Sequence, residues 1–378
     1  MSSQHDESPP DDLIRASPDL EAQTLPTEIE GLKPLAGSLS TQSVGETIED
    51  EAFVLNFTWA GKPFQLELRG TDRVYDLKSA VQSETAVPPE RQKYIGLVKG
   101  KLPGDECLVS QLGVPPKSKF VLVGTPEDKT FKDPHELNLS QFPDTSDNFD
   151  VAYGSGETAV APADDPRNIR LITQKISECP INLINPPRPG KKLLVLDLDY
   201  TLVDSKPLLA GSLPPLECVR PTLHEFLEKA YEDYDIVIWS QTNYWWLESK
   251  LYECGIIGDE SKRHKLLCVC DRKSMFPIFG QKNGQKYKHE VKPLSFLWQQ
   301  PEFQGQWTAK NTIHIDDLSR NFALNPHEGL KIRAYHGATN ATPDDQLIKL
   351  SRYLKNIAQS DDFTQYDHGQ WKKNLPPR

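Results

Sequence analysis

The sequence predicts two folded domains, a small α+β domain followed by a larger doubly wound α/β domain. Three observations lead to this prediction. Residues 52–125 contain short strands of alternating polarity around one amphipathic helix. From residue 191 onward, continuous apolar runs alternate with helical periodicity, which is typical of parallel strands covered on both faces. Aspartates directly follow two of these runs, and doubly wound proteins bind their ligands beyond the carboxyl ends of the strands.

The first domain is predicted to span residues 51–126. Residues 53–59 and 62–68 alternate in polarity around Ala60-Gly61, which indicates a β-hairpin. A helix should follow, because Val74 and the apolar residues after it have helical spacing up to the pair Pro88-Pro89. Two further strands are expected at 93–98 and 119–124.

The second domain is predicted to span residues 179–378. Its apolar runs are four or five residues long and rich in Leu, Ile and Val, as in strands buried on both faces. We expect strands at 193–196, 235–239 and 312–315, a helix at 221–231, and a small hairpin containing residues 276–279 and 282–285.

Two segments fall outside these domains. Residues 1–50 contain no aromatic side chain, and their eleven Asp and Glu against two Lys and Arg give −9 of the net charge of −11. We predict a disordered acidic tail there, because such a segment buries too little apolar area to become ordered. Residues 127–178 are polar and are predicted to be a linker, with a short helix at 169–176 beside the second domain.

Composition also restricts the partners. The charge left for the folded part is only −2, which disfavours a nucleic-acid-binding surface. No apolar run approaches the roughly 20 residues of a membrane span, and no secretory signal is readable. We therefore expect a soluble intracellular monomer with free thiols. Cys268 and Cys270 lie in an apolar run, so we predict buried strand residues there and not metal ligands.

Carboxylates follow two of the predicted strands. Asp197 and Asp199 come after the first, two positions apart and thus nominally on one face, and Asp316 and Asp317 end another. If the two strands are neighbours, these acids meet, and charges about 4 Å apart repel by about 4 kcal/mol at a dielectric near 20. A hard cation such as Mg²⁺ would relieve that repulsion. The alternative is that the acids are solvated strand ends.

Two further residues make the cation site the better interpretation. Ser240 follows the run Ile-Val-Ile-Trp, and Lys292 follows His-Glu-Val. They supply a hydroxyl that can bind an anion and a positive charge that can neutralise it.

The same segments resemble a known superfamily. In order, 196–202, Trp239-Ser240, Val291-Lys292 and Asp316-Asp317 are similar to the four motifs of haloacid-dehalogenase-type phosphatases. The Asp-x-Asp-x-Thr form resembles the branch that acts on the C-terminal domain (CTD) of RNA polymerase II. Residues 71–78 and 89–101 resemble ubiquitin-like (β-grasp) domains, without a terminal Gly-Gly. With 185–188, 230–240, 320–322 and 325–333, the chain resembles CTD phosphatases that carry a ubiquitin-like domain.

This resemblance implies roles for the site residues. Asp197 would attack phosphorus and form an aspartyl-phosphate, and Asp199 would serve as general acid and then as base. Ser240 and Lys292 would hold the phosphoryl oxygens, with Thr201 supporting the first loop.

A metal set is implied as well. Mg²⁺ would be held by Asp197, the backbone carbonyl of Asp199 and Asp317. Asp316 would either orient these ligands or bind the metal itself.

The substrate and partners follow from spacing and resemblance. Only 38 residues separate Thr201 from Ser240, too few for a large cap domain, so an open site for a phosphorylated protein is expected. The resemblance implies docking of the ubiquitin-like domain on the 26S proteasome in the nucleus, with the cytoplasm as the alternative. Ile95 and Val123 would lie in the docking patch, unless both are core residues. The competing functions are an inactive proteasome adaptor and a small-metabolite phosphatase.

Overall fold

The computed structural model describes residues 52–115, 118–126, 151–153, 160–303, 305–339 and 343–375. The predicted acidic tail 1–50 and much of the predicted linker lie outside these ranges. Within them, no helix combines the length and the apolar composition that crossing a membrane requires.

The first domain is a β-grasp fold. Its four-stranded sheet has the order β2-β1-β4-β3, with β1 and β4 parallel and the outer pairs antiparallel. The predicted hairpin is confirmed, and Ala60 and Gly61 at its tip both have positive φ, as a tight hairpin turn requires. The strand expected at 93–98 is shorter, because Gly96 turns to φ +84°. The elements are β1 (Ala52–Trp59), β2 (Lys62–Arg69), α1 (Val74–Thr85), η1 (Pro89–Arg91), β3 (Lys93–Ile95), η2 (Val109–Leu112) and β4 (Lys119–Val123).

The second domain is built on a five-stranded sheet. The strand order is β12-β11-β6-β7-β8, and every neighbouring pair is parallel. The three strands predicted from apolar runs are all present, and Cys268 and Cys270 are buried in a fourth, as predicted. The strands are β6 (Lys192–Leu196), β7 (Tyr234–Trp239), β8 (Leu266–Cys270), β11 (Thr312–Asp316) and β12 (Gly329–Lys331).

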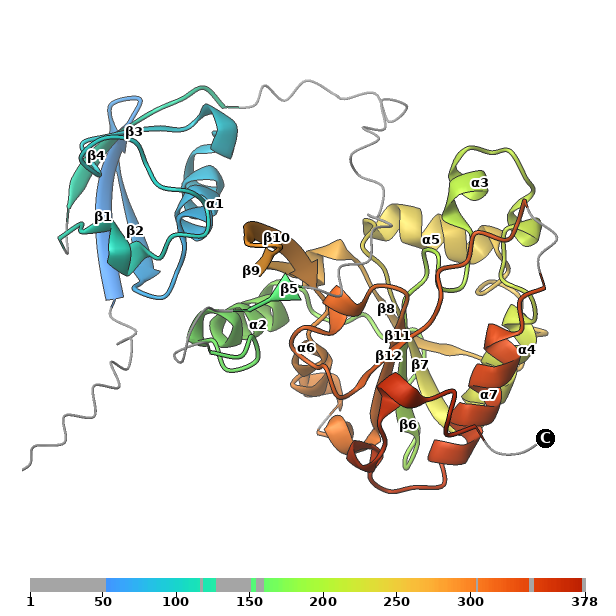
Figure 1. Cartoon of the computed structure of the whole chain (residues 1–378). Coiled ribbons are helices and arrows are strands. Elements are labelled where there is room, and N and C mark those ends of the chain that lie inside the picture. Colours follow the sequence, from blue (N-terminus) through green and yellow to red (C-terminus); the bar gives the residue numbers. More distant parts are fainter. Residues whose placement is uncertain are drawn as a thin grey trace, which may run out of the picture. The chain divides into compact units, whose positions relative to one another are not determined.

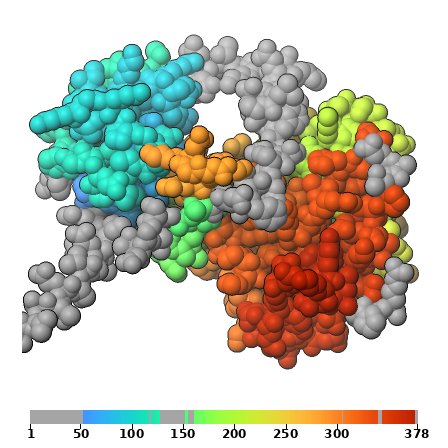
Figure 2. All heavy atoms as spheres, in the orientation of Figure 1, coloured from blue at the N-terminus to red at the C-terminus, as the bar shows by residue number. Residues whose placement is uncertain are grey.

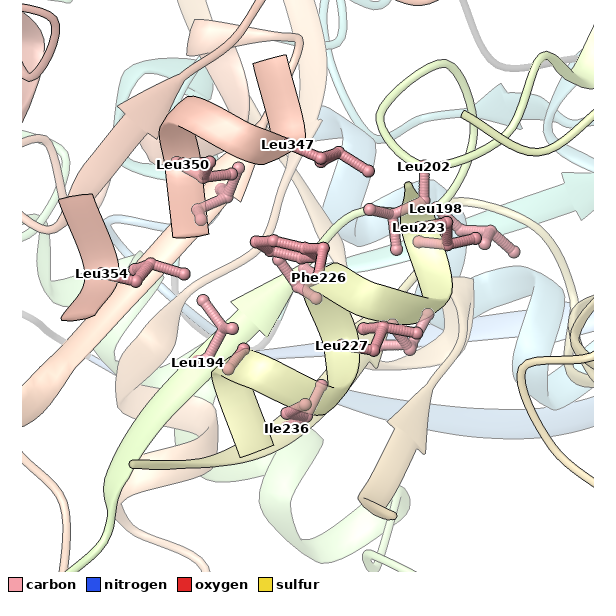
Figure 3. Close-up of a cluster of buried hydrophobic side chains, with 14 of the residues drawn as sticks. Leu194, Leu198, Leu202, Leu223, Phe226, Leu227, Ile236, Leu347, Leu350 and Leu354 are labelled. Atoms are coloured by element: carbon pink, nitrogen blue, oxygen red, sulfur yellow. The ribbon is translucent and has the colours of Figure 1, made fainter. Parts of the chain in front are cut away.

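Helices cover both faces of this sheet, because successive apolar side chains along a strand point to opposite faces. Leu193 and Val195 join a cluster with α6, whereas Leu194 and Leu196 join the cluster of α4 and α7. Figure 1 shows α4 and α7 on one side of the sheet and α6 on the other, and Figure 3 shows Phe226 in the middle of the larger cluster. In Figure 2 the C-terminal residues, coloured red, pack against the rest of this domain. The helices are α3 (Ser205–Leu209), α4 (Leu223–Tyr231), α5 (Tyr244–Glu253), α6 (Leu294–Trp298) and α7 (Gln346–Ile357), with 3₁₀ turns η4 (Pro215–Glu217), η5 (Arg272–Ser274), η6 (Pro301–Phe303), η7 (Ala309–Asn311), η8 (Ser319–Phe322), η9 (Phe363–Gln365) and η10 (His368–Gln370).

The chain also forms a separate three-stranded sheet with the order β10-β9-β5. The predicted hairpin is present as β9 (Phe276–Lys282) and β10 (Gln285–Val291), and β5 (Val151–Ala152) pairs with β9. The helix predicted near 169–176 is α2 (Pro166–Glu178), whose Ile172 packs on Phe276 and Val291 of the hairpin. The hairpin matters for the site because Lys292 follows β10 directly.

Candidate active site

Adjacent strands bring the predicted site residues together. β6 lies between β11 and β7, so Asp197 at its carboxyl end is flanked by Asp316 and Asp317 on one side and by Ser240 on the other. The Asp197 amide donates to the Ile315 carbonyl at 2.9 Å, which fixes the first residue beyond the strand. The two strands that end in aspartates are therefore neighbours, which is the condition for their carboxylates to meet.

Asp197 is buried and only half paired. Its Oδ1 accepts a hydrogen bond from Lys292 Nζ at 2.5 Å. Its Oδ2 has no hydrogen-bond partner among the residues that the structure describes. Burial raises the pKa of Asp197 to about 7, helped by Asp316 and Asp199 and opposed by Lys292. One oxygen of the carboxylate is thus available to a ligand.

The two adjacent aspartates at the end of β11 have different surroundings. Asp316 accepts from Lys292 Nζ at 2.7 Å, from Asn321 Nδ2 at 2.8 Å and from the Leu318 amide at 2.8 Å. Burial alone would raise the pKa of Asp316, but Lys292 and the hydrogen bonds lower it below its ordinary value. Asp316 is therefore an ionised group that holds Lys292 in place.

Asp317 is supported more weakly. Thr201 Oγ1 donates to its Oδ1 across 3.4 Å. Burial raises the pKa of Asp317 to about 9, and the charges of Asp316 and Asp197 add to the effect. Thr201 thus contacts the acid of the neighbouring strand, in addition to its place in the first loop.

These acids fit a divalent cation. Asp197, Asp316 and Asp317 each offer a carboxylate oxygen within 4.8 Å of the others. The bare Oδ2 of Asp197 and the raised pKa of Asp317 are both expected where carboxylates face one another without a counter-charge. Oxygen donors of this kind suit Mg²⁺. The carboxylate of Asp199 is not part of this set.

Asp199 is instead held by three donors. Its Oδ1 accepts from Ser205 Oγ at 2.5 Å and from Lys250 Nζ, and its Oδ2 accepts from Ser240 Oγ at 2.8 Å. Burial would raise the pKa of Asp199, but Lys250 and the two hydroxyls lower it. The Asp199 carboxylate therefore lies beside the acid cluster, with partners of its own.

The loop that carries these aspartates has an unusual backbone. Tyr200 adopts φ +61°, and its amide donates to the Val203 carbonyl at 2.7 Å. Arg220, fully buried, donates to the Thr201 carbonyl at 2.8 Å and forms a bidentate pair with Asp344. The strained turn is therefore linked, through Arg220, to a segment near the end of the chain sequence.

The site opens through a small pocket. Gln241 and Asn321 face each other across its edge, with a hydrogen bond of 3.1 Å between their side chains. The pocket is lined by Asp197, Asp199, Tyr200, Gln241, Asp317, Leu318 and Asn321.

Sequence reasoning missed several members of this site. Ser205, Gln241 and Asn321 carry no pattern that separates them from loop residues. Lys250 did carry a signal, because it lies beside Leu251 and one turn from Leu247 on the buried face of α5. A lysine on the apolar face of a helix needs a buried partner.

Two expectations about exposed aromatic and aliphatic residues have clear outcomes. The helical spacing of Trp245 and Trp246 predicts core residues, with groove lining as the alternative. For Trp245 the core interpretation is wrong, since 63% of it is exposed. Ile95 and Val123 are 58% and 46% exposed, so the core interpretation is wrong for both. Val121, which pairs with Ile95 and precedes Val123 by two positions on β4, is 46% exposed and belongs to the same surface.

Comparisons with known proteins agree with this geometry. Residues 192–364 match the family described as NLI interacting factor-like phosphatase. Together with the relatives described next, this match shows that the chain is a phosphoprotein phosphatase of the haloacid-dehalogenase type.

The relatives extend the match to the first domain. "Ubiquitin-like domain-containing CTD phosphatase 1" of chicken (Gallus gallus) is 39% identical over 84% of this chain and 96% of its own length, and that of human (Homo sapiens) is 38% identical over the same shares. The chain belongs to the family of ubiquitin-like domain-containing CTD phosphatases. Among solved structures, the ubiquitin-like (UBL) domain of Plasmodium falciparum Dsk2 is 26% identical over 20% of this chain and all of that chain, with a TM-score of 0.18.

Proposed function

We propose that this protein is a Mg²⁺-dependent protein serine/threonine phosphatase that works through an aspartyl-phosphate on Asp197. The observation that supports this most is the bare Oδ2 of Asp197, which belongs to a buried carboxylate at the wall of the pocket. Lys292 holds the other oxygen, so Oδ2 is the atom presented to an incoming phosphate. The domain is inferred to be doubly wound, on the basis of apolar clusters on both faces of its sheet.

In the first step, an oxygen of Asp197 forms a bond to phosphorus as the bond from phosphorus to the substrate oxygen breaks. The electron pair of the broken bond stays on the leaving oxygen, which takes a proton from Asp199. Lys250 and two hydroxyls hold Asp199 ionised in the substrate-free site, so this carboxylate must take up a proton before the step. Asp197, Asp317 and the Asp199 carbonyl would hold Mg²⁺, which would reduce the repulsion between the anionic nucleophile and the anionic phosphate.

In the second step, Asp199 takes a proton from water, whose oxygen attacks phosphorus and releases Asp197 and inorganic phosphate. The lowered pKa of Asp199 keeps the carboxylate ionised and therefore able to accept this proton. Lys292 and Ser240 are placed to hold the phosphoryl oxygens, since their polar atoms lie on the two sides of the aspartate pair. Asp316 keeps Lys292 charged and oriented.

The proposed substrate is a phosphorylated protein segment. Between Thr201 and Ser240 the described chain forms only α3, η4, α4 and β7, which leaves no room for a cap domain. A small metabolite needs enclosure to be recognised, whereas a protein segment needs an accessible groove. The name of the relatives, CTD phosphatase, fits the same class of substrate.

The test compares wild type with Asp197→Asn on phosphoserine peptides and on sugar phosphates, with Mg²⁺ and with EDTA. We expect peptide hydrolysis that requires both Mg²⁺ and Asp197. Asp361→Asn is the matched control, because Asp361 is fully exposed. Wild-type activity that survives EDTA, or activity in Asp197→Asn, would refute the mechanism. Activity on sugar phosphates alone would favour the metabolite phosphatase, and the absence of any activity would favour the adaptor.

We also propose that the ubiquitin-like domain recruits the enzyme to the 26S proteasome, in the nucleus. The support is the exposed apolar surface of Ile95, Val121 and Val123 on β3 and β4. The full-length chain should capture proteasomes, and Ile95→Arg with Val123→Arg should abolish capture. Glu84→Arg, on the exposed side of α1, is the control. Equal capture by all three proteins would exclude this surface, and a fluorescent fusion tests the nuclear location.

A further inference from the structure

Lys250 is a buried lysine without a place in the mechanism described above. It lies on α5 and is 2% exposed. Its Nζ donates to Oδ1 of Asp199, and both side chains of this ion pair are almost fully buried. Removing a lysine from water costs several kcal/mol unless a charge pairs with it. The carboxylate of Asp199 is therefore the partner that compensates the buried charge of Lys250.

The donors on Asp199 divide into two groups. Oδ1 accepts from Lys250 and from Ser205, whose hydroxyl is at 2.5 Å. Oδ2 accepts from Ser240 at 2.8 Å. The two groups differ because Ser240 is the residue proposed to bind a phosphoryl oxygen, whereas Lys250 and Ser205 do not line the pocket.

This division has a consequence when substrate enters. A serine hydroxyl has one hydrogen to donate, so Ser240 cannot donate to Asp199 and to the phosphoryl group at the same time. Once Ser240 turns to the phosphate, Oδ2 loses its donor while Oδ1 keeps both of its partners. The carboxyl group then remains anchored at Oδ1 and has a free oxygen toward the pocket.

We propose that Lys250 is a positioning residue that, with Ser205, anchors Oδ1 of Asp199 so that Oδ2 reaches the leaving oxygen of the phosphoserine. This inference rests on the proposed function, since it assigns Asp199 the proton transfer of the first step. Lys250 itself does not touch the phosphate. Its effect should therefore depend on how much the leaving group needs a proton.

Two substrates separate this role from a structural one. The alkoxide of serine is a poor leaving group and needs the proton, whereas p-nitrophenolate leaves without one. We expect Lys250→Met to lower kcat/KM for a phosphoserine peptide by about 100-fold or more, and kcat/KM for p-nitrophenyl phosphate by less than about 10-fold. The ratio kcat/KM is the useful quantity because it covers the steps up to loss of the leaving group.

Three further variants complete the test. Lys250→Arg keeps the positive charge and should recover part of the peptide activity. Ser205→Ala removes the second anchor and should show the same dependence on the leaving group, even if Lys250→Met does not fold. Lys349→Met removes a surface lysine paired with Asp345 and should behave as wild type.

The outcomes are distinct. Equal losses on both substrates in Lys250→Met and in Ser205→Ala would overturn the positioning role and leave the proposed function intact. A wild type that does not hydrolyse the peptide, or an active Asp197→Asn, would refute the proposed function and this inference with it. A selective loss on the peptide, partly restored by Lys250→Arg, would establish the role.

Discussion

Asp317 should make the metal-free protein less stable as the pH rises through neutrality. Its pKa is about 9 in the folded protein, raised by burial and by Asp316 and Asp197, against an ordinary 3.8. Between these values the folded state carries a proton that the unfolded state has lost. The stabilisation is therefore complete below pH 3.8 and is lost as the pH rises to about 9. One proton corresponds to a fall in the free energy of unfolding of about 1.4 kcal/mol per pH unit.

The pH range of the measurement matters. Burial lowers the pKa values of His289 and His368 from 6.5 to about 4. These two groups therefore add a slope of the opposite sign between about pH 4 and pH 6.5. Urea unfolding in EDTA should therefore be compared at pH 7 and pH 8. Tryptophan fluorescence is a suitable signal, because six of the seven tryptophans lie in the phosphatase domain and Trp59 alone lies in the ubiquitin-like domain.

Asp317→Asn should remove most of this slope, because the amide does not titrate and Asp197, with a pKa of about 7, contributes only a small part above pH 7. Asp361→Asn, at a fully exposed position, should keep it. Saturating Mg²⁺ should also flatten the slope in wild type, since a cation that binds the folded state keeps its ligands ionised. A wild-type free energy of unfolding that is equal at pH 7 and pH 8 in EDTA, or a slope that persists in Asp317→Asn, would refute the account of this acid cluster.

Three other changes test the packing of the protein. Lys292→Met should lower the free energy of unfolding by about 3–5 kcal/mol, because it leaves two buried carboxylates without their cation. Lys349→Met at the surface should cost less than about 1 kcal/mol. Equal urea midpoints for the two variants would contradict this prediction. Phe226→Ala should cost about 3–5 kcal/mol in the same measurement, as expected for a large cavity in the cluster of Figure 3. Ile95→Ser should change the melting of the ubiquitin-like domain by no more than about 0.5 kcal/mol, and a larger loss would show that this side chain is part of the core.

The sequence predicted the strands well where burial on both faces leaves no choice of residue. Leu193–Leu196 is such a run, and the acids that follow it are recognisable because they interrupt it. Burial of a single polar residue is harder to predict. Lys250 lies on a helix whose other charged residues are exposed, and its partner Asp199 is 51 positions away. Only the fold brings the two together.

The exposure of individual side chains and the backbone of individual turns were also hard to predict from the sequence. Trp245 has the size and spacing of a core residue, but it lies in the first turn of α5, beyond the part of the helix that Leu247 and Leu251 bury. The turn at Tyr200 could not be predicted either, because a positive φ at a tyrosine is supported by contacts from other segments, including Arg220 and, through it, Asp344. Local sequence does not contain that constraint.

The long separation of the site residues along the chain affects when the enzyme becomes competent. Lys292 follows Asp197 by 95 positions, and Asp317 follows Thr201 by 116. A nascent chain released from the ribosome tunnel only as far as β10 holds Asp197 without its ammonium partner and without the acids of β11. Since domains are synthesised from the N-terminus, the ubiquitin-like domain can fold first, while the phosphatase remains inactive. Hydrolysis thus begins only when nearly the whole second domain has been made.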